Sequence, residues 1–261
     1  MERKRAGLSA YALKLIALVS MTLDHIGEFI HGVPFFFRMI GRIAAPLFFF
    51  TLAFSFQNTS SRKRFLFRLY IASAVTELIK IAVFYIDRSS KDIVVNNMFS
   101  TMFLSVLMAV LLEDIVIFFK SANYAVVLCC AAAVVIMVIW PFVSLNLPDT
   151  VLWFITAFAP AITRTEGGVP WFILGAGMCL FASKRRLLII FYSIYCVLEL
   201  AGTILFAGAA TLLYNIQWMM VFTLPFFFLY NGQRGKGRKW FFYLYYPLHI
   251  WVIYAFSRMI S

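Results

Sequence analysis

Stretches of about 20 apolar residues recur along the whole chain, and they constrain its fold more than any other feature. Each stretch can cross a hydrocarbon core of about 30 Å as one α-helix. The apolar residues run continuously instead of alternating, which excludes a β-barrel. The predicted spans lie at residues 9–31, 38–56, 64–86, 98–119, 122–140, 186–206, 212–230 and 240–258. We therefore predict an all-α polytopic membrane helix bundle, with residues 1–261 forming a single domain.

Charged residues are few and are placed between the apolar stretches. Only 13% of the residues are charged, whereas soluble domains carry about 25%. The net charge of +12 comes from basic clusters that follow the positive-inside rule, not from a nucleic-acid-binding surface. These clusters are Arg3-Lys4-Arg5, Arg62-Lys63-Arg64, Lys184-Arg185-Arg186 and Arg234 with Lys236, Arg238 and Lys239. We predict a multi-pass protein of the cytoplasmic (inner) membrane of a bacterium, with a cytoplasmic N-terminus, the lipid bilayer as a partner and no nucleic acid.

Residues 148–183 do not read as a single span. They hold two short apolar runs, separated by Arg164, Glu166, Gly167 and Gly168. With a cytoplasmic N-terminus, the loop around Pro141 to Asp149 lies outside, whereas Lys184-Arg185-Arg186 belongs inside. The chain must therefore cross an odd number of times between 150 and 183. About 30 residues are too few for three crossings. We predict one crossing plus a re-entrant or interfacial segment, and hence about nine crossings in all.

Titratable residues lie inside the first apolar stretch, where they are costly. On a helical wheel, Asp24, His25, Glu28 and His31 fall within about a third of the circumference. One reading is interhelical hydrogen bonding that only stabilises the bundle. The other is a site of proton transfer, which we favour. The four cysteines also fall in apolar stretches but show no metal-ligand spacing, so no metal is expected.

Further polar residues are expected within or at the ends of the other spans. Arg38 and Arg42 share a helix face, and their best partners are Asp24, Glu28 or an anionic ligand. Glu77 is spaced for an ion pair with Lys80 in the third span, and Asn97 begins the fourth. Glu113 is expected to be solvated at the inner end of the fourth span. In the last span, His249 follows Tyr246 and a proline that can loosen the helix.

Several strings in the sequence resemble the TraX family of conjugal-transfer membrane proteins. They are KLIA at 14–17, MTLDHIG at 21–27, RMIGRIAAPLF at 38–48, LYNG at 229–232 and FYLYYPLH at 242–249. The resemblance implies acetylation of a pilin N-terminal amine by acetyl-CoA, and a relation to membrane acyltransferases with an essential histidine in an early helix, which His25 matches. The family's Glu-hydrophobic-Pro-hydrophobic-Asp string is incomplete here, because Glu77 is followed by Leu78, Ile79, Lys80 and Ile81. The acceptor therefore stays open among protein, glycan and small molecule.

These observations favour an acetyl-CoA-dependent N- or O-acetyltransferase. His25 would act as general base or become transiently acetylated, with Asp24 or Glu28 fixing its tautomer. Arg42, or alternatively Asn97, would stabilise the oxyanion. Substrate binding is assigned to Arg38, Glu77, Asn97, Tyr246 and His249. The phosphates of coenzyme A are expected near Lys14, Arg62, Arg64, Arg68, Arg234 and Lys236.

Two other functions fit parts of the sequence. A proton-coupled transporter would use the same titratable residues as a relay, although no related halves or matched broken helices are visible. A scaffold of an envelope complex would use them only for packing. Release of coenzyme A without solute uptake would identify the enzyme.

Overall fold

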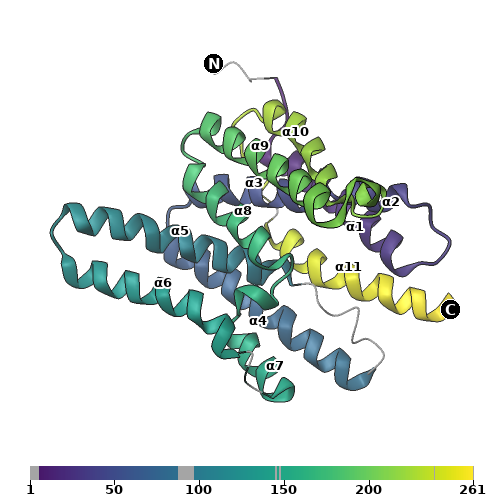
Figure 1. Cartoon of the computed structure of the whole chain (residues 1–261), viewed down its shortest axis with the longest axis horizontal. Coiled ribbons are helices and arrows are strands. Elements are labelled where there is room, and N and C mark those ends of the chain that lie inside the picture. Colours follow the sequence, from purple (N-terminus) through teal and green to yellow (C-terminus); the bar gives the residue numbers. More distant parts are fainter. Residues whose placement is uncertain (1–5, 88–96, 145, 147, 238, 261) are drawn as a thin grey trace. The chain divides into compact units, whose positions relative to one another are not determined.

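The structure, a computed structural model, describes residues 6–87, 97–144, 146, 148–237 and 239–260. Every regular element among these residues is a helix, as predicted (Figure 1). Within the described part, six helices are long and apolar enough to cross a membrane. The chain divides into two compact units, Met1–Thr51 with Lys184–Ser261, and Leu52–Ser183. Whether these units form a single domain stays a prediction.

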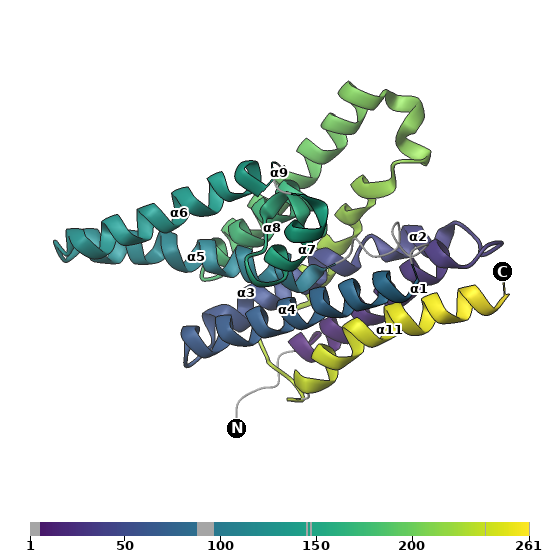
Figure 2. The same cartoon turned by 90° about the horizontal axis from the view of Figure 1, so that it is seen from below.

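The first unit is organised around α1 (Ala10–Phe29), which packs against α2 (Phe36–Gly41) and α11 (Lys239–Ile260). Figures 1 and 2 both show α1 and α11 side by side. α3 (Ala44–Gln57) begins in this unit. The remainder is α9 (Arg185–Gly202), η3 (Thr203–Ala207), η4 (Ala209–Leu213), η5 (Ile216–Thr223) and α10 (Leu224–Leu229). α9 packs against η3, η5 and α10.

The second unit is built on α5 (Met98–Lys120), which contacts α4 (Arg62–Ile86), α6 (Tyr124–Ser144) and α8 (Gly168–Phe181). α7 (Asp149–Phe158) packs on α4, and η2 (Ile162–Arg164) packs on α6 and α8. Buried apolar side chains join α5, α6, η2 and α8 in one cluster: Leu104, Met108, Met137, Ile162, Phe172 and Ala176. Few residues of α6 are buried, since only 11% of its apolar window is buried in the structure.

Two predicted spans are interrupted. The stretch at 38–56 is split into α2 and α3 by a turn at Arg42 and Ile43. Pro46 explains the break, because it has no N–H to donate to the carbonyl of Arg42. The stretch at 212–230 begins as the 3₁₀-helices η4 and η5, and Pro225 then lies in the first turn of α10.

Residues 148–183 contain two short α-helices, α7 and α8, in the two apolar runs, with the 3₁₀-helix η2 between them. Gly167, which precedes α8, and Gly168, which begins it, both have positive φ. The hydroxyls of Thr101 and Ser105 on α5 donate to the carbonyls of Glu166 and Phe172, so α8 runs alongside α5 in the same direction. This direction agrees with a crossing that ends inside, while the total number of crossings stays a prediction.

Candidate functional site

Asp24 on α1 is held by two arginines of the following segment. Arg42 Nη2 lies 2.5 Å from both carboxylate oxygens of Asp24. Arg38 Nη1 lies 3.1 Å from Asp24 Oδ1 and 2.9 Å from Glu28 Oε2. The predicted pairing of Arg38 and Arg42 with these two carboxylates is therefore confirmed. Two positive and two negative charges balance within this cluster.

All three nitrogens of the Arg42 guanidinium have acceptors. Besides Asp24, Nε donates to the carbonyl of Arg38 at 3.3 Å, and Nη1 donates to Gln217 Oε1 at 3.2 Å. Arg42 thereby links α1 to η5. In contrast, every polar contact of the Arg38 guanidinium to the described residues uses Nη1, which leaves Nε and Nη2 as donors for a ligand.

A glycine permits this close approach of α1 and α2. A Cβ placed on the buried Gly41 would overlap the side chain of Asp24. A Cβ on Gly27 would lie 3.1 Å from the Arg38 side chain. Gly41 therefore creates the space that the carboxylate of Asp24 occupies.

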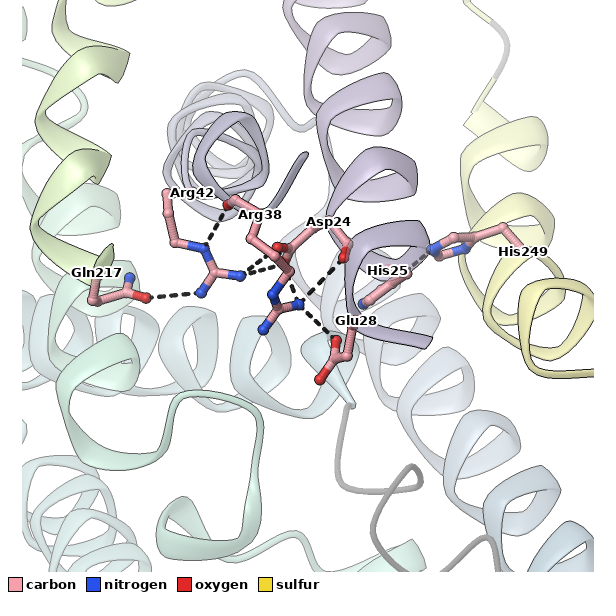
Figure 3. Close-up of polar contacts among 7 residues, drawn as sticks. All are labelled: Asp24, His25, Glu28, Arg38, Arg42, Gln217 and His249. Carbon is pink, nitrogen blue, oxygen red and sulfur yellow. Dashed lines mark hydrogen bonds and ion pairs between the residues drawn. The ribbon is translucent and has the colours of Figure 1, made fainter. Parts of the chain in front are cut away.

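His25 points away from this cluster and toward α11 (Figure 3). Its Nδ1 lies 2.8 Å from Nε2 of His249, and the two rings stack with centroids 5.0 Å apart. Both residues are buried, at 4% and 6% exposure. The expectation that Asp24 or Glu28 orients His25 is wrong, because those carboxylates bind arginines and the partner of Nδ1 is His249.

Aromatic and hydroxyl groups surround the imidazole pair. Tyr245 stacks on His249 with ring centroids 5.2 Å apart, and its hydroxyl lies 2.9 Å from Thr22 Oγ1 on α1. The predicted residue Tyr246 is buried, with its ring 5.9 Å from that of His249. His31 lies beyond the end of α1 and is exposed, so it does not join the cluster suggested by the helical wheel.

Basic residues gather at the beginning of α1. The segment after α10 is bound there, since Ala10 and Tyr11 N–H groups donate to the carbonyls of Gln233 and Arg234 at 2.8 and 3.1 Å. Lys14 Nζ lies 5.8 Å from the centre of the Phe242 ring, and its charge interacts with that of Arg234. Arg234 and Lys236 are exposed. Of the predicted phosphate-binding residues, Lys14 and Arg234 thus lie together at one end of α1.

The comparison with protein families decides which group this chain belongs to. The model of the family described as TraX protein matches residues 9–257, nearly the whole chain. The chain belongs to the TraX family. The resemblance seen in the sequence is confirmed, and membership associates the chain with membrane proteins of pilin modification.

Another relative covers little of the chain. An uncharacterized protein of Rickettsia prowazekii (strain Madrid E) is 32% identical over 68 residues, which are 26% of this chain and 27% of that protein. The match therefore spans about a quarter of that relative's length. No solved structure matches the chain.

The other predicted residues of this TraX protein lie in the second unit. Glu77 binds Lys80 Nζ at 3.0 Å and accepts a hydrogen bond from the Asn97 amide at 2.8 Å. Asn97, which is fully buried, also caps α5. These contacts show an interhelical polar network between α4 and α5, so any role of Glu77 and Asn97 toward a substrate stays a prediction.

The arginines at the start of α4 differ in their surroundings. Arg62 pairs with Glu113 at 2.6 Å and lies over the Phe56 ring. Glu113, expected to be solvated, therefore has a protein partner instead. Arg64 is exposed, and the buried Nε of Arg68 has no hydrogen-bond partner among the described residues. Roles for these residues in phosphate binding are untested.

Sequence reasoning missed three residues of the TraX site. Thr22, Gln217 and Tyr245 make contacts that join α1 to η5 and α11. Thr22 and Tyr245 stand within the strings that carry the family resemblance, which was the available signal. Gln217 has no such signal, because a single glutamine in an apolar run does not reveal its partner.

Proposed function

We propose that this TraX protein is a membrane acyltransferase that moves an acetyl group from acetyl-CoA to an amine or hydroxyl of an acceptor. One observation carries the proposal: the predicted transmembrane helix α1 has basic residues at its start and a buried imidazole, that of His25, further along. Lys14 and His25 are 11 residues apart, or about 16 Å along the helix axis. Basic residues at the start of a helix and a buried base further along it suit an anionic donor whose reactive group must reach the membrane interior.

The donor's phosphates would bind at the basic end of α1. Arg234 and Lys236 are exposed in the segment bound there, and the charge of Lys14 interacts with that of Arg234. Arginine and lysine are the usual phosphate ligands. Under the predicted topology this end faces the cytoplasm, where acetyl-CoA is available. Arg62, Arg64 and Arg68 remain further candidates from the second unit.

His25 would serve as general base. It takes the proton from the acceptor N–H or O–H while the acceptor atom attacks the thioester carbonyl. The C–S bond then breaks, and the coenzyme A thiolate takes the proton from the imidazolium. The products are the acetylated acceptor and free coenzyme A thiol, so that atoms and charges balance. A covalent acetyl-His25 intermediate is the competing sequence of steps, and rapid quenching followed by mass spectrometry distinguishes the two.

Arg38 is the better placed of the two arginines to contact the acceptor or the carbonyl oxygen. Its Nε and Nη2 are available for a ligand, whereas Arg42 would first have to release Asp24, Gln217 or the carbonyl of Arg38. Asp24 and Arg42 then act by holding Arg38 in position. An oxyanion donor of this kind is worth about 10²–10³ in kcat.

The test uses the purified protein in proteoliposomes with labelled acetyl-CoA and a membrane extract that supplies acceptors. The proposal predicts release of coenzyme A thiol and transfer of the label to a molecule that mass spectrometry can identify. A pilin N-terminus, a glycan and a small amine are all acceptable results. Proton-driven solute uptake without thioester cleavage would instead establish the transporter, and absence of both activities would favour the scaffold.

A further inference from the structure

The hydrogen bonds of His249 determine which of its nitrogens carries the proton. Nδ1 of His249 lies 3.0 Å from the carbonyl oxygen of Tyr245, one turn earlier in α11. A carbonyl can only accept, so Nδ1 must be the donor. A neutral imidazole has one N–H, and Nε2 of His249 is therefore a lone-pair acceptor.

The same reasoning extends to His25. Its Nδ1 is 2.8 Å from the acceptor Nε2 of His249, so His25 must donate through Nδ1–H. The unprotonated nitrogen of His25 is then Nε2. The acceptance of the His249 Nδ1–H by the backbone of α11 thus sets the proton positions of both rings, which belong to buried residues.

We propose that His249 is a positioning residue that holds His25 in the Nδ1–H tautomer and presents the Nε2 lone pair to the acceptor. This inference rests on the proposed function for the role of His25 as a base, whereas the tautomer itself is a property of the resting protein. When Nε2 takes the acceptor's proton, Nδ1–H stays bonded to His249. The imidazolium of His25 then returns the proton on Nε2 to the departing thiolate.

Packing holds the pair of rings in register. Tyr245 stacks on His249 with an interplanar angle of 12°, and Phe29 stacks on His25 with ring centroids 5.7 Å apart. The contact between Tyr245 and Thr22 ties α11 to α1 one turn before His25. A neutral imidazole partner also differs from the carboxylate of the familiar triads, since it orients the base without adding a charge to the membrane interior.

Solid-state NMR of isotope-labelled histidine in proteoliposomes tests the tautomer without any activity. The three histidines are assigned by comparison with His25→Ala, His31→Ala and His249→Phe. We expect His25 as Nδ1–H in the unmodified protein and a shift to Nε2–H in His249→Phe. Finding His25 as Nε2–H in the unmodified protein, or unchanged in His249→Phe, would overturn the proposal.

A conservative variant separates positioning from simple packing. In His249→Gln, the side-chain oxygen can accept from His25 while the amide N–H₂ donates to the Tyr245 carbonyl. We expect this variant to keep the Nδ1–H tautomer and most of kcat, while His249→Phe loses about 10²–10⁴-fold in kcat with KM unchanged. Equal loss in both variants would contradict positioning. Absence of transfer by the unmodified protein would remove the proposed function yet leave the tautomer result standing.

Discussion

At the scale of single residues, two adjacent positions of α1 make different interactions: Asp24 forms ion pairs, and His25 contacts another imidazole. Asp24 faces the arginines of α2 and the turn that follows it, and His25 faces α11 (Figure 3). The carboxylate is thus used to neutralise guanidinium groups, which are expensive at membrane depth without a partner. The imidazole instead contacts the uncharged rings of His249 and Phe29, as a proposed general base would require.

Replacing Asp24 by asparagine tests the charge balance of this cluster. Asp24→Asn leaves Arg42 and Arg38 short of one negative charge, and breaking such a pair costs about 3–5 kcal/mol when it is buried. Because the side chains of Asp24 and Arg42 are 17% and 16% exposed, we expect the free energy of unfolding to fall by an amount toward the lower end of that range. Thermal unfolding in detergent measures it.

Asp114→Asn is the matched control, since the Asp114 carboxylate makes no hydrogen bond or ion pair to the described residues. The double variant Asp24→Asn/Arg42→Gln should recover part of the lost stability. If the thermal unfolding midpoint of Asp24→Asn were no lower than that of Asp114→Asn, the ion pair between Asp24 and Arg42 would contribute nothing to stability.

The sequence could predict the ion-pair cluster of the site. Helical spacing puts Asp24 and Glu28 on one face of α1 and Arg38 and Arg42 on one face of the next segment. These faces were expected to meet because the two segments follow one another in the chain. The partner of His25 comes from a helix more than 200 residues away, and no periodicity within α1 indicates it. Carboxylates close in sequence were therefore expected to orient the imidazole, although His249 does so.

At the scale of elements, the fit of α2 on α1 depends on the absence of a side chain at position 41. In Gly41→Ala, the added methyl group would meet the Asp24 side chain. Overpacking of this kind costs about 1–3 kcal/mol. We expect a lower unfolding midpoint and a lower transfer rate, because Arg38 and Arg42 would move together with α2.

Gly202→Ala is the control for this prediction. Gly202 lies at the end of α9 in the same unit, and a Cβ there would meet nothing within 4 Å. Alanine also favours helix over glycine by about 1 kcal/mol. If Gly41→Ala were as stable as Gly202→Ala, the close packing of the two helices would not matter for the site.

Helix boundaries were predicted well for most of the long helices, although α6 continues through Pro141 to Ser144, beyond its predicted end at residue 140. α1, α4, α5 and α6 agree with the apolar stretches to within a few residues. The divisions between α2 and α3 and between η5 and α10 follow from Pro46 and Pro225, residues that hydropathy alone treats as neutral members of a run. The short helices α7 and α8 were indicated by the glycines between them.

At the scale of the whole molecule, each unit places its predicted cytoplasmic segments at a common end. In the first unit, Arg185 donates to the carbonyls of Phe227 and Phe228, and the segment after α10 binds the start of α1. In the second unit, Gln57 donates to the Cys179 carbonyl, and Arg62 pairs with Glu113. Within each unit, these segments thus lie at one end, and the assignment of that end to the cytoplasm stays a prediction.

Cysteine labelling tests that orientation. In a background without the four native cysteines, Ala210→Cys is expected to react with an impermeant maleimide added to intact spheroplasts. Lys236→Cys is expected to react only after the membrane is permeabilised, because the basic segment lies on the cytoplasmic side. Both positions are exposed in the structure, so each serves as the other's control. Reaction of both from the same side would refute the predicted topology.

The central claim is that the buried imidazole on α1 carries out acyl transfer, and the rate of coenzyme A release tests it most directly. The measurement compares His25→Ala with His31→Ala in proteoliposomes containing equal amounts of folded protein. Both variants lose one imidazole, but His31 is exposed beyond the end of α1. We predict that His31→Ala keeps the unmodified rate and that His25→Ala loses about 10²–10⁴-fold. Equal rates in the two variants would contradict the account.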